Sequence, residues 1–323
     1  MNKIHKVWCF AGLLLPLLAM NLHARESHEN AQSGENPLQS SHLQSSDEYW
    51  HTVGDDVSDR VNAIAVSEDK VFVGGSFSQS WGGPANRIVR FNPYDRSWHS
   101  LGDGIEGYGS VLSILATGDR LFVGGGFGDV DGMQFNNIAF LDLADESWHA
   151  LGDGTVGDVF AIAKNGNNLY VGGDFNSAGN VNASRIARYD LTSGEWHSLG
   201  EGVNGRVSAL AVVGDNLYVG GSFFEAGGEA ATRIARYNLS DESWHNLGEG
   251  INGEVVTFAV DGDHLYAGGI FSQAGGIDSR SVYYSPSLGP RGYVCCFEFM
   301  QHEDKDQRVF VAEFLDDCVC CTC

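Results

Sequence analysis

A motif of two glycines, one variable residue and a phenylalanine recurs five times in this chain. A Trp-His pair recurs with nearly the same period, because successive copies begin 48, 50, 48 and 48 residues apart. Repeats of about fifty residues that contain short strand-like runs are typical of a β-propeller, in which each repeat forms one four-stranded blade. The diglycines are Gly74-Gly75, Gly124-Gly125, Gly172-Gly173, Gly220-Gly221 and Gly268-Gly269, and the tryptophans are Trp50, Trp98, Trp148, Trp196 and Trp244.

The third full repeat shows how one blade divides into strands, which we call a, b, c and d. Apolar or alternating runs separated by turn residues predict strands at 159–163, 169–173, 185–189 and 195–199. Strand a carries small residues at matched positions and strand d carries the tryptophan, as expected if blades converge at a central axis and splay apart outside. We therefore predict that the tryptophans pack between blades. The small residues are Ala63, Ser113, Ala161, Ala209 and Thr257.

The order of motif residues within a repeat resembles a known family. Gly172-Gly173, Tyr189, Trp196 and Leu199 are similar to the kelch repeat, as in the central domain of galactose oxidase. The longer pattern, a diglycine with Phe, then Ala-Gly-Gly and Arg-Ile-Ala-Arg-Tyr, also resembles repeats of fungal cell-polarity cortical markers and of exported bacterial proteins. This resemblance implies a propeller fold over residues 49–284 and, for most such propellers, a binding function.

The two ends of the repeat region predict how the propeller closes. The region begins with a strand d, Tyr49–Val53, and ends after a strand c, Arg280–Tyr284. We therefore predict an all-β, five-bladed propeller of four-stranded antiparallel blades, in which the N-terminal strand completes the last blade and removes exposed sheet edges. A six-bladed body that uses the C-terminal tail is the alternative.

The net charge restricts the partners that the chain can bind. Its 323 residues carry a formal charge of −23, with a pI near 4.6. No basic surface is available to displace counterions from nucleic acid or to adsorb to an anionic membrane. We expect neither partner.

Residues 1–24 have the pattern of a secretory signal peptide, since Lys3 and Lys6 precede an apolar run from Val7 to Met20. An uncleaved anchor is the alternative. Residues 25–48 are polar and predict a flexible leader. No second apolar segment is long enough for a membrane span, so we expect a secreted, periplasmic or cell-surface protein with no integral membrane segment after signal removal.

The tail, residues 285–323, lacks the repeat and holds six of the seven cysteines. In an exported protein these cysteines predict disulfides. A zinc site, or a tail without a selected structure, are the other interpretations. The six are Cys295, Cys296, Cys318, Cys320, Cys321 and Cys323.

The b–c and d–a connections of every blade emerge on the same face, which is where repeat scaffolds usually carry recognition residues. One acid recurs in each d–a loop, and we expect these acids near the axis, around the mouth of the channel. The ring could bind calcium or a cationic ligand; alternatively, each acid is solvated or bonded within its own turn. The acids are Asp55, Asp103, Asp153, Glu201 and Glu249.

Apolar residues in otherwise polar b–c loops are a second candidate for binding. Trp81, Met133, Phe135 and Phe224 form a contact patch if they are exposed together, or pack into their own loops. The histidines that follow the tryptophans lie in five different blades, too far apart for one metal ion. The Arg pairs, such as Arg185/Arg188 and Arg233/Arg236, are expected to bridge to neighbouring acids.

These features favour a non-catalytic binding module for an unidentified protein or carbohydrate ligand, without a cofactor unless calcium binds. Residues 25–294 contain no cysteine, so the copper-radical chemistry of galactose oxidase is not implied. A glycoside hydrolase, which needs two carboxylates in unequal surroundings, is the enzymatic alternative. A structural cell-surface component is the third.

Overall fold

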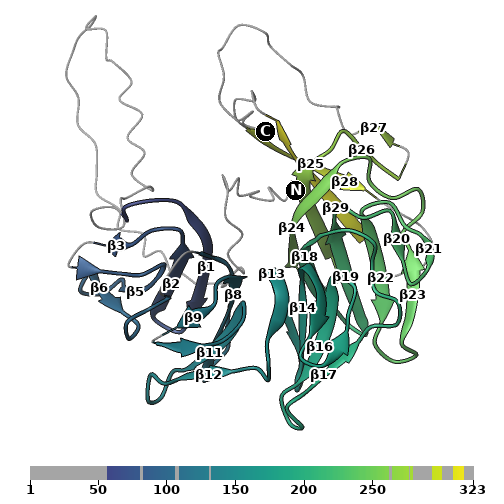
Figure 1. Cartoon of the computed structure of the whole chain (residues 1–323). Coiled ribbons are helices and arrows are strands. Elements are labelled where there is room, and N and C mark those ends of the chain that lie inside the picture. Colours follow the sequence, from purple (N-terminus) through teal and green to yellow (C-terminus); the bar gives the residue numbers. More distant parts are fainter. Residues whose placement is uncertain are drawn as a thin grey trace, which may run out of the picture.

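The computed structural model describes residues 57–80, 83–105, 109–130, 132–261, 264–275, 277–278, 293–299 and 308–315. Figure 1 shows these residues as a series of small twisted sheets that lie side by side in chain order. These ranges contain no helix, and so no helix within them is long enough to cross a membrane. The predicted signal peptide, the leader and Tyr49–Val53 lie outside the described residues.

Four repeats form all four predicted strands, and the fifth forms strands a and b. Strand a is β1 (Val61–Ser67), β7 (Ser110–Ala116), β13 (Thr155–Asn165), β18 (Val207–Val213) and β24 (Glu254–Asp261). Strand b is β2 (Lys70–Gly75), β8 (Arg120–Gly126), β14 (Asn168–Ala178), β19 (Asn216–Gly221) and β25 (His264–Ile270). Strand c is β5 (Ile88–Asn92), β11 (Ile138–Asp142), β16 (Ile186–Asp190) and β22 (Ile234–Asn238), and strand d is β6 (Ser97–Ser100), β12 (Trp148–Ala150), β17 (Glu195–Ser198) and β23 (Ser243–Asn246).

The first four sheets have the antiparallel order a-b-c-d, namely β1-β2-β5-β6, β7-β8-β11-β12, β13-β14-β16-β17 and β18-β19-β22-β23. Strand a of each sheet contacts strand a of the next, from β1 through β7, β13 and β18 to β24. Strand a is therefore the edge at which neighbouring sheets approach each other. This all-β arrangement is propeller-like, as the repeat predicts.

The fifth sheet differs from the expectation. Its order is β24-β25-β29-β28, where β28 is Tyr293–Phe299 and β29 is Arg308–Leu315. β29 runs parallel to β25, with Gly268 opposite Ala312, and so takes the place that we predicted for an antiparallel strand c at Arg280–Tyr284. Both tail strands are rich in valine and phenylalanine, which favour strands wherever a free edge is available. Residues 280–284 themselves lie outside the described residues.

The first glycine of each diglycine makes room for the next sheet. A methyl group at Gly172 would overlap Cγ1 of Val207, and the same overlap recurs at the three other described joints. The valines concerned are fully buried. Each joint is therefore a valine of strand a seated on a glycine of the preceding strand b. The pairs are Gly74 with Val111, Gly124 with Val159, Gly172 with Val207, and Gly220 with Val255.

The second glycine of each diglycine makes room for the backbone of strand a in its own sheet. A methyl group at Gly173 would overlap the carbonyl oxygen of Asp158, where β13 has a bulge between Val159 and Ala161. Because a bulge brings two residues opposite one, the facing backbone comes too close for a side chain. The equivalent contacts are Gly75 with Arg60, Gly125 with Ser110, Gly221 with Arg206, and Gly269 with Glu254.

The tryptophans join the outer edges of neighbouring sheets. Trp196 is 7% exposed, and its indole Nε1 donates to the carbonyl oxygen of Leu151, in the preceding repeat, at 2.9 Å. Trp244 bonds to Leu199 in the same way at 2.9 Å. The prediction that tryptophan packs between blades is confirmed for these residues.

Candidate functional site

The b–c connections are ordered hairpins. Each contains a short strand pair, and in four of the five the first member of the pair is only two residues long. Val130, Ala178, Ala226 and Ala274 are buried, whereas their described neighbours are exposed or partly exposed. The pairs are β3 (Gln79–Ser80) with β4 (Gly83–Pro84), β9 (Asp129–Val130) with β10 (Met133–Gln134), the end of β14 with β15 (Val181–Asn182), β20 (Glu225–Ala226) with β21 (Glu229–Ala230), and β26 (Gln273–Ala274) with β27 (Ile277–Asp278).

The preceding d–a loop holds each hairpin in place. The backbone N–H of Gly227 donates to the carbonyl of Gly202 at 2.8 Å, and Gly179 and Gly275 make the equivalent bonds at 2.7 Å. The side chain of Asn204 adds two bonds, because its Oδ1 accepts the backbone N–H groups of Phe224 and Glu225. Backbone and side-chain bonds from the d–a loops thus hold the hairpins of this face in place.

The recurring acids lie in turns at the ends of strand d. In the third repeat the N–H of Gly202 donates to the carbonyl of Leu199 at 3.0 Å, and Glu201 projects from the turn between them. The same carbonyl accepts the indole of Trp244. These acids therefore lie in the turn that directly follows the outer strand of each sheet, and the predicted ring of carboxylates around the axis stays a prediction. Asp103, Asp153, Glu201 and Glu249 are all exposed, and Asp55 lies outside the described residues.

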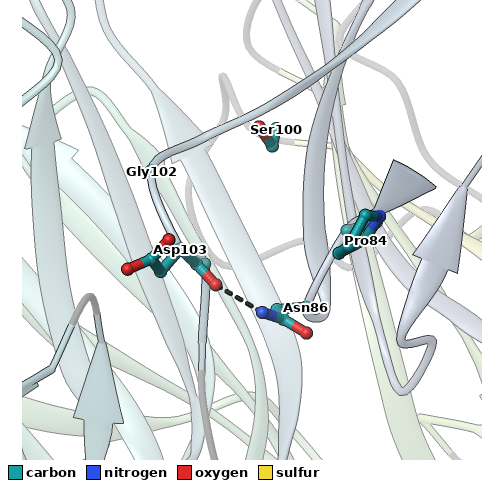
Figure 2. A pocket seen from close by; sticks show the side chains of 7 residues that line it. Pro84, Asn86, Ser100, Gly102 and Asp103 are labelled. Carbon is teal, nitrogen blue, oxygen red and sulfur yellow. Dashed lines mark hydrogen bonds between the residues drawn. The ribbon is translucent and has the colours of Figure 1, made fainter. Parts of the chain in front are cut away.

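One acid lines a small pocket. Figure 2 shows Asp103 and Asn86 side by side at this pocket, between the d–a turn and the start of strand c. The side-chain amide of Asn86 donates to the backbone carbonyl of Asp103 at 2.5 Å, and Pro84 and Ser100 complete the walls. The carboxylate of Asp103 is exposed to solvent. The second repeat has an equivalent bond, from Asn136 to Asp153 at 2.9 Å.

The four apolar loop residues have different surroundings. Met133 is 45% exposed and Phe224 is 55% exposed, as a contact patch requires. Phe135 is only 4% exposed and belongs to the core between the first two sheets, so its assignment to the binding face is wrong. Phe135 lies just beyond β10, and its backbone N–H donates to the carbonyl oxygen of Gly128 at 2.8 Å, so the alternation of that short strand does not extend to it. Trp81 lies outside the described residues.

The arginines have structural roles. Arg185 pairs with Asp174, with 3.3 Å between Nε and Oδ1, as predicted for bridging to an acid. Arg233 instead donates to the carbonyl of Ile251 at 3.2 Å and stacks its guanidinium over the ring of Phe224, 4.6 Å from the centroid. The contacts of Arg233 thus join the following d–a loop to the hairpin that carries Phe224.

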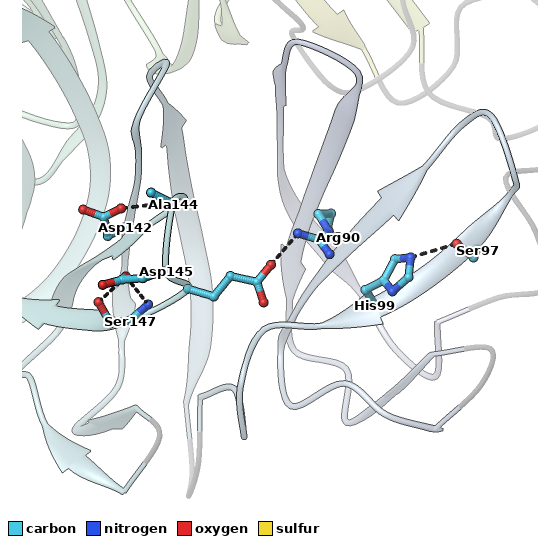
Figure 3. A network of polar contacts seen from close by, with 8 residues as sticks. Arg90, Ser97, His99, Asp142, Ala144, Asp145 and Ser147 are labelled. Atoms are coloured by element: carbon cyan, nitrogen blue, oxygen red, sulfur yellow. Dashed lines mark hydrogen bonds and ion pairs between the residues drawn. The ribbon is translucent and has the colours of Figure 1, made fainter.

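Sequence reasoning missed a cluster of Asp, Ser and His at the c–d turns. Ser147 Oγ donates to Asp145 at 2.6 Å and lies 2.8 Å from Nε2 of His149. Figure 3 shows the equivalent Ser97–His99 contact. The signal was Asp-x-Ser-Trp-His, which recurs at 95–99, 145–149 and 241–245.

This cluster does not have the geometry of a catalytic triad. The serine lies between the other two groups and gives its proton to the carboxylate, so the histidine cannot act as its base. The hydrogen bonds from Ser147 hold the pKa of Asp145 below its usual value, as expected for the cap of a tight turn. The histidines of the described strands d lie one to a sheet, as predicted.

The described residues contain no group of three or more His, Cys, Asp or Glu that could hold a metal ion. Each of the four described d–a acids sits in its own turn. Calcium binding by these turns stays a prediction.

Two family models match the chain. The model described as the Rax2 C-terminal beta propeller domain matches residues 153–267, and a beta-propeller domain of unknown function (DUF5122) matches residues 69–95. No curated protein matches. The class of protein that these matches and the sheet order define is a β-propeller; a kelch or galactose oxidase type is not confirmed.

Several solved structures resemble the fold. The computationally designed Ika4 protein is 14% identical, with a TM-score of 0.40 over 57% of this chain and 93% of that chain. The extracellular domain of the putative one component system BT4673 from B. thetaiotaomicron is 11% identical, with a TM-score of 0.46. That match covers 66% of this chain but only 26% of the BT4673 chain. A chain of the Mitotic Checkpoint Complex is 18% identical, with a TM-score of 0.42 over 62% and 56% of the two chains.

Proposed function

We propose that this chain is an exported, non-catalytic binding module that contacts a protein or carbohydrate through its b–c hairpins and d–a turns. The observation that carries the proposal is the exposure of Met133 and Phe224 on hairpins that hydrogen bonds hold rigid. The repeat does not require these side chains, since the position of Phe224 is taken by Ser78, Gly128 or Asn176 in other repeats. Exposed apolar side chains on a rigid frame are typical contact residues.

The acids on the same face favour a partner with positive charge at its contact surface. Four described turns each present one exposed carboxylate, and the chain as a whole carries a charge of −23. Attraction between these carboxylates and a positively charged partner accelerates association. The same negative charge repels nucleic acid. The binding module needs no cofactor. If calcium does bind these turns, it raises the melting temperature, and Asp153→Asn reduces that rise.

The frame of this module is, in our proposal, a kelch-like ring of five blades that is exported by the signal at residues 1–24. Ring closure through residues 49–53 removes the free edges of the first and last blades, which supports the proposal. Deletion of residues 46–54 is expected to lower the melting temperature of the whole domain. An unchanged melting curve would disprove closure by this segment.

No catalysis is part of the proposal. A glycoside hydrolase needs an acid and a nucleophile or base with different surroundings, whereas Asp103, Asp153, Glu201 and Glu249 occupy the same kind of turn. We expect no turnover of chromogenic glycosides. Turnover that Asp103→Asn or Asp153→Asn abolishes would replace the binding module with the hydrolase.

The binding function is tested with a double variant, Met133→Ser and Phe224→Ser, immobilised beside the wild type. Both are exposed to the exported protein fraction of the source cell and to a glycan array. A ligand held by the wild type should be lost by the double variant. Tyr94→Ser is the matched control, because Tyr94 is 80% exposed but lies in a c–d turn, away from the hairpins. Equal loss in the control, or no ligand for any form, contradicts the proposal.

A further inference from the structure

The third repeat departs from the others where strand β13 begins. In three other repeats this part of the d–a connection holds an aliphatic residue followed by a polar one, whereas the third repeat has Thr155 followed by Val156. Thr155 takes the buried position, where it is 2% exposed and its hydroxyl donates to the carbonyl oxygen of Gly157 at 2.8 Å. Val156 is 72% exposed. The other pairs are Val57-Ser58, Val203-Asn204 and Ile251-Asn252.

In the other repeats the polar residue has a structural role, because its side-chain oxygen accepts two backbone N–H groups of the following hairpin. Asn204 and Asn252 bond in this way, and Ser58 does so in the first repeat. The side chain of Val156 has no acceptor and cannot form these bonds. The third repeat therefore gives up two hydrogen bonds and exposes an aliphatic side chain that gains no burial in return. Departures of this kind from a local rule are typical of functional positions.

Two acids lie opposite each other close to Val156. Asp158 and Asp174 are direct partners in the β13–β14 ladder, and both are exposed. Like charges at such a pair are destabilising. Arg185 offsets the charge of Asp174, whereas Asp158 forms no ion pair with the residues that the structure describes. No other described sheet has two acids at this position, since the equivalent pairs are Arg60 with Ser76, Ser110 with Gly126, Arg206 with Ser222, and Glu254 with Ile270.

The connection that carries Val156 is bonded to two hairpins of the proposed binding face. The backbone N–H of Thr155 donates to the carbonyl of Asn136 at 2.9 Å, at the end of the second hairpin, which also carries Met133. On its other side, the carbonyl of Gly154 accepts the N–H of Gly179 in the third hairpin at 2.7 Å. Val156 therefore projects from a segment that joins the second hairpin to the third.

We propose that the start of β13 is a docking site for a protein segment in which an apolar side chain lies next to a lysine or arginine. Val156 supplies the apolar contact, and Asp158, beside Asp174, supplies the charge that pairs with the basic residue. The cost of exposing a valine and of placing two acids opposite each other is then offset when the partner covers them. This inference rests on the proposed binding function and narrows its ligand to a protein.

The chemistry of the site favours a protein over a carbohydrate. A sugar presents hydroxyl groups, which need donors and acceptors on the protein, and an aliphatic side chain offers neither. An apolar side chain of a protein segment instead gains from contact with Val156, because both lose contact with water. A lysine or arginine beside it meets the charge of Asp158.

A random peptide library displayed on phage tests the docking site, with the full chain immobilised as the target. We expect the enriched peptides to combine Lys or Arg with an aliphatic or aromatic residue. Each purified peptide is then titrated against the wild type and the variants. Val156→Asn should weaken binding about tenfold or more, because it removes the apolar contact. Asp158→Asn should weaken binding about two- to fivefold and reduce its dependence on salt.

The variants are chosen so that loss of binding is distinguished from loss of the fold. Asparagine is the residue that the fourth and fifth repeats carry at this position, so Val156→Asn should melt at or above the wild-type temperature. Tyr94→Asn is the matched control, because Tyr94 is 80% exposed in a c–d turn, away from the hairpins. It should leave the affinity of every peptide unchanged.

Four results overturn the proposal: no peptide is enriched, the enriched peptides lack basic residues, they bind Val156→Asn as tightly as the wild type, or Val156→Asn melts well below the wild type and is therefore structural. Peptides that the Met133→Ser, Phe224→Ser double variant loses but Val156→Asn retains would keep the proposed binding function and remove this docking site. Peptides that only Val156→Asn loses would support the docking site and contradict the role of Met133 and Phe224.

Discussion

The contacts between sheets and the hairpins above them differ in what they repeat. At the joints both backbone and side chains recur, since a valine meets a glycine and an indole meets a leucine carbonyl in sheet after sheet. In the hairpins the backbone bonds recur, but the side chains differ and include the exposed Met133 and Phe224. The difference indicates that packing restricts the joints, whereas the hairpins retain positions at which side chains can be chosen for a ligand.

Trp196→Ala is the largest test of this difference. It removes a buried indole and its bond to Leu151, so we expect a loss of about 3–5 kcal/mol in the free energy of unfolding. Trp196→Phe should keep most of the packing and lose about 1–2 kcal/mol. Denaturant unfolding followed by circular dichroism measures both. A loss below about 1 kcal/mol for the alanine variant would show that the outer joint is not part of the core.

Gly173→Ala tests the inner side of a blade. The added methyl group overlaps the backbone carbonyl of Asp158, which cannot rotate away, so the free energy of unfolding should fall by about 1–3 kcal/mol. Gly118→Ala is the control, because nothing lies within 4 Å of its methyl position. Similar stabilities for the two variants in urea would contradict the role that we assign to the second glycine.

The strands and the packing of the tryptophans could be predicted because they follow from periodicity. Strand d pairs Trp196 on the inside with His197 outside, and this alternation is visible in the sequence. The recurrence of the first glycine in each diglycine was also visible in the sequence, but the packing that requires it was not. Only the structure shows that Val207 of the next repeat occupies the space above Gly172.

The hairpins and the position of the acids could not be predicted. A strand of two residues carries no periodicity, so Phe135 and Met133 looked alike although one is buried and the other exposed. The sequence does not show where a d–a loop makes its turn, so it did not reveal that each acid lies directly after strand d. The parallel β29 was not foreseen, since nothing in its sequence specifies a partner.

Alkaline pH gives a smaller test of the joint between the third and fourth sheets. Burial raises the pKa of Tyr237 to about 12, with a further contribution from the negative charge of Glu242. Because the folded pKa exceeds the unfolded value near 10, this stabilisation is complete below pH 10 and is lost as pH rises toward 12. Between pH 10 and pH 11–12, the free energy of unfolding of Tyr237→Phe should fall less than that of the wild type, by on the order of 1–2 kcal/mol. Urea unfolding at each pH measures the difference. Parallel pH profiles would contradict this, and Tyr94→Phe, at an exposed position, is the control.

The ion pair between Arg90 and Glu146 should have the smallest effect, although it also joins two sheets. Figure 3 shows the contact of Arg90, and 47% of the glutamate side chain is exposed, so solvent screens the attraction. A double-mutant cycle of Arg90→Ala and Glu146→Ala should give a coupling of about 0.2–1 kcal/mol that declines in 1 M salt. A larger coupling that 1 M salt does not reduce would mean that charge as well as packing holds neighbouring sheets together. The joints would then depend on exposed polar side chains as well as on the recurring buried contacts, and would differ less from the hairpins.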